Sequence, residues 1–529
     1  MERRQTLVER RQLLAAAAAA AASTGLGGAR AISAEAAPGD VAAALARFRQ
    51  SVPSSFDPDY VEHVLIPFFL TSVYVGEPPV FPMINPILSK ENAFPAEFLG
   101  LIYKGWTPSR EEGVTVFLQG LEHRGENNLR KRIYMSAVTP DLYSSMYRGK
   151  VIAFFNELLD QKHAGKPFMR HYLDYYFDLY WDLHVGVKGK DVPAEIRQVG
   201  ESFNTVLAYL NPMQQIVHDN YMKVRGSLDV LRGWIDARVN DVATGRVANT
   251  DRTFVHYWLK NAGNGEHFSK QDVVFECFHN FVALSQWGAT IYGIMGRLDE
   301  ATGDADMRTW FAKTMSGDYD DAKGTPYTPL ELYVMEVLRS ISSNPGSIST
   351  LSDTRESIYG PSPFQLLGLP YEKHGYVTTP HPITSKSPIQ WKDPLTFDPE
   401  RYRTVPTSAE VDEAKCQELG LAKCPFDHTT FDVADGRRAS LHNSGFGTVF
   451  GVVDGKPLPV CDHAGFAPFG FGYRRCPGEQ LTIQVFAEFL RKVWTDKIVF
   501  SKLNLASPER VPVGPNSVID DDITFNRRG

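Results

Sequence analysis

Hydrophobic residues dominate one long stretch that has no polar face. Between Ser269 and Leu298, apolar side chains recur all around the helical wheel. A helix that is apolar on every side is buried in the protein interior. We therefore expect a long buried helix over about 269–298. Its apolar members are Val273, Val274, Phe275, Phe278, Phe281, Val282, Leu284, Trp287, Ile291, Ile294 and Met295.

A second helix is predicted by its start signal, Thr328-Pro329-Leu330-Glu331. Thr followed three residues later by Glu is a capping box, and Pro is favoured at the first helical position. Ser343-Asn344-Pro345-Gly346 predicts the end of this helix. Glu336 and Arg339 lie three residues apart and so share one face. Taken alone, such a pair is typical of a solvated ion pair that contributes little.

The first part of the chain has the pattern of a leader. Arg10-Arg11 precedes the apolar stretch Leu13–Ala22, and Ala34-Glu35-Ala36 offers a cleavage site. The stretch is much shorter than the roughly 20 residues of a membrane-spanning helix, so we expect no transmembrane anchor. The pattern resembles a twin-arginine export signal over 1–37, which predicts the periplasm, or the thylakoid lumen in a plastid-containing organism. The alternative is an alanine-rich leader or transit peptide, with a cytoplasmic protein if it is not a signal.

Composition narrows the class of the remaining chain, 38–529. The protein has 529 residues, of which 43% are hydrophobic and 12% aromatic, and it shows no internal repeat. That length can bury a large core. A net charge of −7 without a basic stripe argues against nucleic acid as a partner.

The chemistry is concentrated in Phe469-Gly470-Phe471-Gly472-Tyr473-Arg474-Arg475-Cys476-Pro477-Gly478. This glycine-rich loop places a cysteine beside two arginines and before an apolar helical segment. Cationic neighbours and a helix N-terminus lower the pKa of a cysteine, and the thiolate is the form that binds metal. A cysteine thiolate is also a ligand of haem iron. The alternative is a buried structural cysteine.

The loop resembles the haem-binding loop of cytochromes P450, Phe-x-x-Gly-x-Arg-x-Cys-x-Gly. Phe469, Gly472, Arg474, Cys476 and Gly478 match its fixed positions. The resemblance implies haem b (iron protoporphyrin IX) with Cys476 as the iron ligand, Phe469 near the sulfur and Arg474 on a propionate. It also implies the cytochrome P450 fold, which is mainly α with small β-sheets in a triangular helical prism formed by one domain.

Two further segments resemble the same family. The segment from Asp393 to Tyr402 is similar to the one that precedes the haem loop. In the family it completes a buried triad, which implies Glu336, Arg339 and Arg401 here. Residues 121–132 resemble the helix that reaches the haem propionates, which implies His123, Arg130 and Arg132 as candidate contacts. A solvated basic face is the alternative for this last set.

The long helix resembles the one that crosses the distal haem face, where ordinary monooxygenases carry Ala-Gly-x-Asp/Glu-Thr. Either 283–287 or 286–290 occupies that position, and neither contains an acid. Residues 285–289 are similar to the amide-bearing segment of the allene oxide synthase and hydroperoxide lyase branch. Gln286, with Ser285 or Asn280, is predicted to hydrogen-bond an oxygenated substrate, and the second register keeps Thr290. Alternatively these groups bond the helix backbone or a neighbour. We expect His279 to be a core histidine.

The stretch 403–465 is rich in Gly, Ser, Thr and Asp and is longer than this connection usually is in the family. It must emerge on the cysteine side of the haem, where redox partners dock in typical relatives. We expect it either to cover that face or to be a tolerated surface loop. Cys416, Cys424 and Cys461 lie in it, so a disulfide is possible in an oxidising compartment, with free thiols as the alternative.

These features predict a haem-thiolate oxidoreductase acting on an apolar, lipid-like small molecule. Because the distal acid is missing, we favour peroxide or a substrate hydroperoxide as the oxygen source. The alternative is a dioxygen-dependent monooxygenase with an external, ferredoxin-type electron donor. A haem-binding sensor without turnover is the third class, disfavoured because no signalling module accompanies the domain.

Overall fold

The computed structural model describes residues 38–66, 131–206, 213–225, 227–246, 250–262, 269–342, 346–350, 356–357, 360–361, 376–418, 420, 429–432, 437–443, 449–470, 475–513 and 518–528. The predicted leader, 1–37, lies outside these residues, so its export function stays a prediction. No helix in this part of the chain is both long and apolar enough to cross a membrane.

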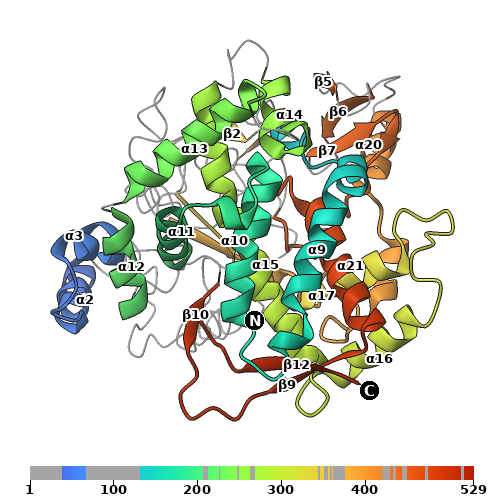
Figure 1. Ribbon diagram of the computed structural model, residues 1–529. Helices are drawn as coiled ribbons and strands as arrows, with labels where there is room; N and C mark the ends of the chain where they lie inside the picture. Colours follow the sequence, from blue (N-terminus) through green and yellow to red (C-terminus); the bar gives the residue numbers. More distant parts are fainter. Residues whose placement is uncertain are drawn as a thin grey trace.

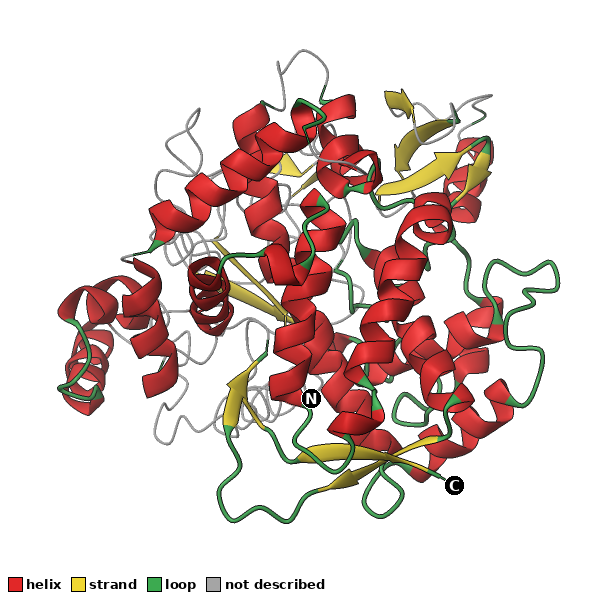
Figure 2. Cartoon of the chain, viewed as in Figure 1, coloured by secondary structure: helices red, strands yellow, loops and turns green. Residues whose placement is uncertain are grey.

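Helices make up most of the described structure, and the strands form small sheets (Figure 2). The helices are α2 (Pro38–Ser51), α3 (Pro58–Tyr60), α8 (Pro140–Leu142), α9 (Arg148–Leu158), α10 (Met169–Val185), α11 (Ala194–Val206), α12 (Gln215–Arg225), α13 (Leu228–Ala243), α14 (Phe254–Asn261), α15 (Lys270–Leu298), α16 (Ala305–Met315), α17 (Pro329–Ser340), α19 (His381–Thr384), α20 (Ser408–Glu418) and α21 (Glu479–Thr495). Shorter 3-10 and π turns are η1 (Val61–Leu65), η4 (Tyr143–Tyr147), η5 (Gln161–His163), η6 (Gly189–Asp191), η7 (Thr250–Arg252) and η8 (Pro399–Thr404). The predicted fold class, mainly α with small sheets, is confirmed.

All the strand pairs among the described residues are antiparallel. β1 (Gly346–Thr350) pairs with β4 (Tyr376–Pro380), β2 (Glu356–Ser357) with β3 (Gly360–Pro361), β9 (Ile498–Lys502) with β12 (Ile523–Arg527), and β10 (Arg510–Pro512) with β11 (Val518–Asp520). A four-stranded meander is formed by β5 (Thr429–Asp432), β6 (Arg438–Asn443), β7 (Val449–Val453) and β8 (Lys456–Pro457).

The predicted buried helix is α15, which begins one residue after Ser269. The Ser269 side chain accepts from the backbone N–H of Asp272, and the Asp272 carboxylate accepts from that of Ser269, so a capping box fixes the start. α15 contacts α10, α13, α14 and α16 at the centre of the molecule (Figure 1). This packing on several sides explains why its sequence has no polar face.

Helix α17 also begins as predicted. The Thr328 side chain accepts from the N–H of Glu331, and the Glu331 carboxylate accepts from the N–H of Thr328 at 2.7 Å. The helix packs against α21 and η8. Glu336 and Arg339 are fully buried, so the solvated ion pair is not what forms here.

The inserted stretch contains more regular structure than its composition indicates. The meander β5–β8 lies within it, and α20 packs on β7 (Figure 1). Strand pairing runs from Thr429↔Leu441 through Asn443↔Val449 to Val453↔Lys456. The insertion is therefore a small sheet with a helix, at least over its described residues.

Candidate functional site

The predicted ligand, Cys476, lies at the end of a loop that closes on itself. The Cys476 N–H donates to the Phe469 carbonyl at 2.8 Å, and the Gly478 N–H donates to the Cys476 sulfur at 3.4 Å. Gly470 has a φ of 72°, in the left-handed region that favours glycine. Phe469 itself packs toward Phe466, with ring centroids 6.2 Å apart. These contacts hold the sulfur immediately before the start of α21.

Many protein atoms surround the sulfur of Cys476, but its side chain keeps some exposed surface. Burial among protein atoms raises the pKa of the Cys476 thiol, the Gly478 N–H lowers it and the nearby Glu479 carboxylate raises it again. The sequence predicts that cationic neighbours lower the pKa of the Cys476 thiol. Lys131 and Arg475 do act in that direction, but burial outweighs them. A bound metal cation would reverse the balance, because a coordinating thiol is deprotonated outright.

A buried ion pair is formed by the residue before Cys476 and the first residue of α21. Arg475 donates to both carboxylate oxygens of Glu479, at 2.7 and 2.9 Å, and both residues are 3% exposed. The remaining Nη1 of Arg475 has no hydrogen-bond partner among the described residues. A buried guanidinium nitrogen without a partner requires explanation, and a carboxylate-bearing cofactor is a suitable partner. The donor set of thiolate and cation therefore fits haem.

Other predicted cofactor contacts are only partly described. Gly472, Arg474, His123 and Arg130 lie outside the described residues, so their roles stay predictions. Arg132 is half-buried on the helical turn 131–135. Sequence reasoning missed its neighbour Lys131, which is 1% exposed and donates to the Arg475 carbonyl at 2.7 Å. The only signal in the sequence was the basic run 130–132.

The three residues of the implied triad lie together. The Glu336 carboxylate accepts from Arg339 at 2.7 and 2.8 Å and from Arg401 at 3.2 Å. It also accepts from the Tyr402 hydroxyl and the Asp398 N–H, each at 2.9 Å. Arg339 further donates to the carbonyls of Ser385 and Pro394 at 2.8 Å. The triad thus ties α17 to the segment that precedes the insertion.

Two contacts show which face of α15 points toward the Cys476 side. The Asn280 amide accepts from the Tyr134 hydroxyl and donates to His184 Nε2 at 2.9 Å. The Trp287 indole donates to the Thr482 hydroxyl on α21 at 3.2 Å. Residues seven apart share a helix face, so both lie on one stripe. Asn280 has protein partners on both sides of its amide, which favours the alternative in which it bonds a neighbour.

Gln286 and Thr290 lie four residues apart and so share a face of α15, and Thr290, three residues after Trp287, also borders the stripe of Asn280 and Trp287. The Thr290 side chain is fully buried, and its hydroxyl has no hydrogen-bond partner among the described residues. Gln286 is half-buried. Ser285 lies on the other side of the helix. A Cβ at Gly288 would meet Val513 and Tyr172 at 2.3 and 2.6 Å, so α15 packs tightly at that position. His279 lies outside the described side chains.

Sequence reasoning also missed Glu276. This acid is fully buried on α15, one turn before Asn280 on the same stripe. Burial raises the pKa of Tyr134, and the negative charges of Cys476 and Glu276 raise it further. Tyr134 is therefore within electrostatic range of both groups. Glu276 lies before both registers that we compared with the family motif, which is why the motif comparison did not find it.

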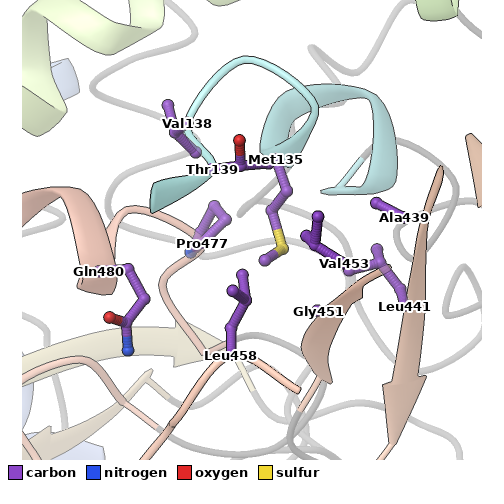
Figure 3. Close-up of a pocket in the computed structure, with 10 residues that line it drawn as sticks. All are labelled: Met135, Val138, Thr139, Ala439, Leu441, Gly451, Val453, Leu458, Pro477 and Gln480. Carbon is purple, nitrogen blue, oxygen red and sulfur yellow. The ribbon is translucent and has the colours of Figure 1, made fainter. Parts of the chain in front are cut away.

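A small pocket lies beside the ligand loop (Figure 3). It is formed where the turn 131–139, the inserted sheet and the residues after Cys476 meet, and its walls are mostly apolar. Met135 points toward the sheet between them (Figure 3). The lining residues are Met135, Val138, Thr139, Ala439, Leu441, Gly451, Val453, Leu458, Pro477 and Gln480.

The cysteines of the insertion are free thiols where they are described. Cys461 is buried and forms a β-bridge with Thr407, and Cys416 is half-buried. Cys424 lies outside the described residues, so a disulfide involving it stays a prediction. In the described part of the chain, no group of three or more His, Cys, Asp or Glu side chains is placed to hold a metal ion. Cys476 would thus be a single protein ligand.

Comparison with known proteins relates the chain to solved structures. No family model matches the sequence, and no curated protein matches it. Ligand-free cytochrome P450 OleT is 14% identical, with a TM-score of 0.54 over 86% of this chain and 89% of that chain. A variant of cytochrome P450SP alpha (CYP152B1) is 14% identical, with a TM-score of 0.53 over 87% and 91%. The haem domain of cytochrome P450DA is 13% identical, with a TM-score of 0.52 over 87% of each chain. The fold of this chain is that of the cytochromes P450, as its motifs predicted.

Proposed function

We propose that this chain, whose fold is that of the cytochromes P450, is a haem-thiolate oxidoreductase with Cys476 as the iron ligand. The observation that carries the proposal is the closed loop that presents an accessible sulfur inside the protein. Phe469 would support the loop, and the cations Lys131 and Arg475 would balance the negative charge of thiolate and propionates. When bound, haem b would supply an iron at which O–O bonds are cleaved, a step that a thiolate ligand favours.

For the oxygen source, we favour peroxide or a substrate hydroperoxide. Gln286 and Thr290 bring an amide and a hydroxyl to one face of α15, and the Thr290 hydroxyl has no hydrogen-bond partner among the described residues. These two groups can hydrogen-bond an oxygenated substrate and hold it in a fixed orientation. They do not form the acid–alcohol pair that delivers protons to dioxygen in ordinary monooxygenases.

The substrate that we propose is apolar and lipid-like. α15 carries the buried apolar side chains Phe281, Leu284 and Trp287, of which Phe281 packs on α10, so the surroundings of this helix are apolar. A variant of cytochrome P450 OleT, which has the same fold at 14% identity, was solved in complex with arachidonic acid. That complex shows that this fold can hold a fatty acid chain.

A second candidate function is dioxygen-dependent monooxygenation with an external, ferredoxin-type electron donor. Glu276 is the observation that favours it, because it places a buried carboxylate on α15 within electrostatic range of Tyr134. Buried acids on such a helix can transfer protons. The two candidates therefore differ in which polar groups of α15 act.

The test combines ligation and turnover. The reduced protein with carbon monoxide should show the spectral signature of thiolate ligation. Cys476→His should abolish that signature, while Cys416→Ser, a thiol outside the site, should keep it. Retention of the signature by Cys476→His would show that the ligand assignment is wrong.

Turnover then separates the two candidates. A fatty acid hydroperoxide should be consumed without any reductant, and Gln286→Leu should slow this about 100-fold, the typical loss for one polar group in a reaction site. Ser285→Ala, on the other side of α15, should change the rate little. Turnover that strictly requires dioxygen and an electron donor would favour the monooxygenase. In that case Glu276→Gln, rather than Gln286→Leu, should lower the turnover rate.

A further inference from the structure

Lys131 has an unusual position for a lysine. Its side chain is 1% exposed, and its ammonium donates to the Arg475 carbonyl at 2.7 Å. Burying an ammonium costs several kcal/mol unless it is hydrogen-bonded or paired. The contact joins segments that are 344 residues apart in sequence. A buried lysine at this point therefore has a specific role that an apolar side chain would not fill.

The carbonyl that Lys131 binds belongs to the peptide group directly before the ligand. The N–H of that same peptide group is the one on Cys476, which donates to the Phe469 carbonyl at 2.8 Å. A peptide group is planar, so fixing its C=O and its N–H fixes the orientation of the whole plane. The N–H is held from within the loop, and the C=O is held from outside it by Lys131.

The charge of Lys131 adds a second effect. The guanidinium of Arg475 donates two hydrogen bonds to the Glu479 carboxylate, from Nε and Nη2, so the charges of that pair largely offset each other near the sulfur. The Lys131 ammonium, bound to the carbonyl next to Cys476, adds a positive charge close to the sulfur. In a protein interior such a charge acts strongly because the effective dielectric is low.

We infer that Lys131 is a positioning residue for the Cys476 ligand: its ammonium fixes the peptide plane before the sulfur and places a positive charge beside the thiolate. The inference rests on the proposed haem-thiolate function. A positive charge near the iron stabilises the reduced, more negative state, so it raises the reduction potential. Lys131 thus sets both the geometry and the potential of the site without contacting substrate.

Three substitutions in the full chain loaded with haem separate the two effects. Lys131→Met removes donor and charge, Lys131→Gln keeps an N–H donor without charge, and Lys131→Arg keeps both. The matched control is Lys150→Met, because Lys150 also donates to a backbone carbonyl at 2.7 Å, that of Asp182, far from the ligand loop. The readouts are the carbon monoxide spectrum of the reduced protein and the midpoint potential, neither of which needs a substrate.

In Lys131→Met, the intensity of the thiolate signature in the carbon monoxide spectrum should be several-fold lower than in wild type. The midpoint potential of this variant should be more negative. Lys131→Gln should keep more of the signature but show the same negative shift, and Lys131→Arg should restore both. Unchanged spectrum and potential in Lys131→Met would overturn the inference, as would equal effects in Lys150→Met. If the Met variant does not fold, the Gln and Arg pair decides alone, and equal potentials in those two would overturn the role of charge.

These results are distinguishable from failure of the proposed function. A wild-type thiolate signature together with an unchanged Lys131→Met variant would reject only Lys131. A wild-type signature that responds to Lys131→Met, without turnover of any hydroperoxide, would reject only the proposed reaction. A wild-type protein with no thiolate signature would reject both.

Discussion

At the scale of single residues, the hydrogen bonds around His184 decide which ring nitrogen carries its proton. Its Nδ1 lies 2.8 Å from the Tyr180 carbonyl, which can only accept, so Nδ1 carries the proton. Nε2 then accepts from the Asn280 amide at 2.9 Å. Burial lowers the pKa of His184 to about 3, the carbonyl of Tyr180 raises it and the charge of Lys150 lowers it. The buried histidine that supports α15 is thus on α10, whereas the sequence directed attention to His279.

This pKa predicts how stability depends on pH. The unfolded chain protonates His184 near pH 6.5 and the folded protein only near 3, so the unfolded state binds more protons in that window. The free energy of unfolding should therefore fall as pH drops below 6.5, by about 1.4 kcal/mol per pH unit for one group. His184→Gln should reduce this slope by about that amount, as measured by urea unfolding between pH 4 and 6.

His381, which is buried, and His463, which is half-buried, contribute to the same dependence, because burial lowers the pKa of each to about 4. The comparison must therefore be between slopes, with wild type and variant measured in the same buffers. An identical slope in His184→Gln would mean that His184 is already protonated in the folded protein. His184→Gln is expected to remove the contribution of His184 to the pH dependence. The free energy of unfolding itself need not be preserved in this variant.

At the scale of elements, the triad shows how α17 holds the chain that leads to the ligand loop. Glu336 is the single carboxylate between Arg339 and Arg401, whose side chains are 1% and 7% exposed. Trp391 adds two contacts. Its indole donates to the Gly465 carbonyl at 2.9 Å, and its ring stacks on that of His463 with ring centroids 3.9 Å apart. The segment just before the loop is therefore anchored to α17 through these contacts.

Glu336→Gln should destabilise the protein by about 3–5 kcal/mol, because it leaves two buried cations without a matching charge. Glu400→Gln is the matched control, since Glu400 pairs with Arg403 on the surface and such pairs contribute about 0–1 kcal/mol. Chemical unfolding followed by circular dichroism measures both. An equal loss of unfolding free energy in the two variants would show that the triad stabilises the protein no more than a surface ion pair does.

The same elements show what could be predicted from sequence. The hydrophobic pattern located α15 and a capping box located α17, because both signals are local. The face of α15 that meets the ligand side was not predictable, because it depends on where Tyr134, His184 and Thr482 lie in space. Lys131 was missed for the same reason. The strands of the insertion are short and flanked by Gly and Ser, so their composition resembled a loop.

At the scale of the whole molecule, the inserted sheet lies against the surface beside Cys476. Ala439, Leu441 and Val453 form an apolar cluster with Met135, and Arg437 pairs with Asp141 across the same boundary. Gln480, in the first turn of α21, donates to the Pro459 carbonyl. These contacts hold the described part of the insertion against the turn 131–139 and the start of α21; that it covers the cysteine side and restricts access of an electron donor protein stays a prediction.

Loosening this cover should therefore increase electron transfer. Leu441→Asp places a charge in the apolar cluster and should raise the rate of reduction by a generic ferredoxin, measured by stopped-flow absorbance. Ser440→Asp, the neighbouring position whose side chain points to the other face of the strand, should not. An unchanged rate in Leu441→Asp, with the sheet shown to be detached by limited proteolysis, would contradict the covering role.

The contact between Lys131 and Arg475 also has a consequence for the order of folding. Its partners are 344 residues apart, and contacts of such separation form late because a long loop must close first. The ligand loop can thus reach its final shape only after both halves of the chain have been synthesised and have met. Haem is expected to be captured by a nearly finished protein, as one of the last steps of its maturation.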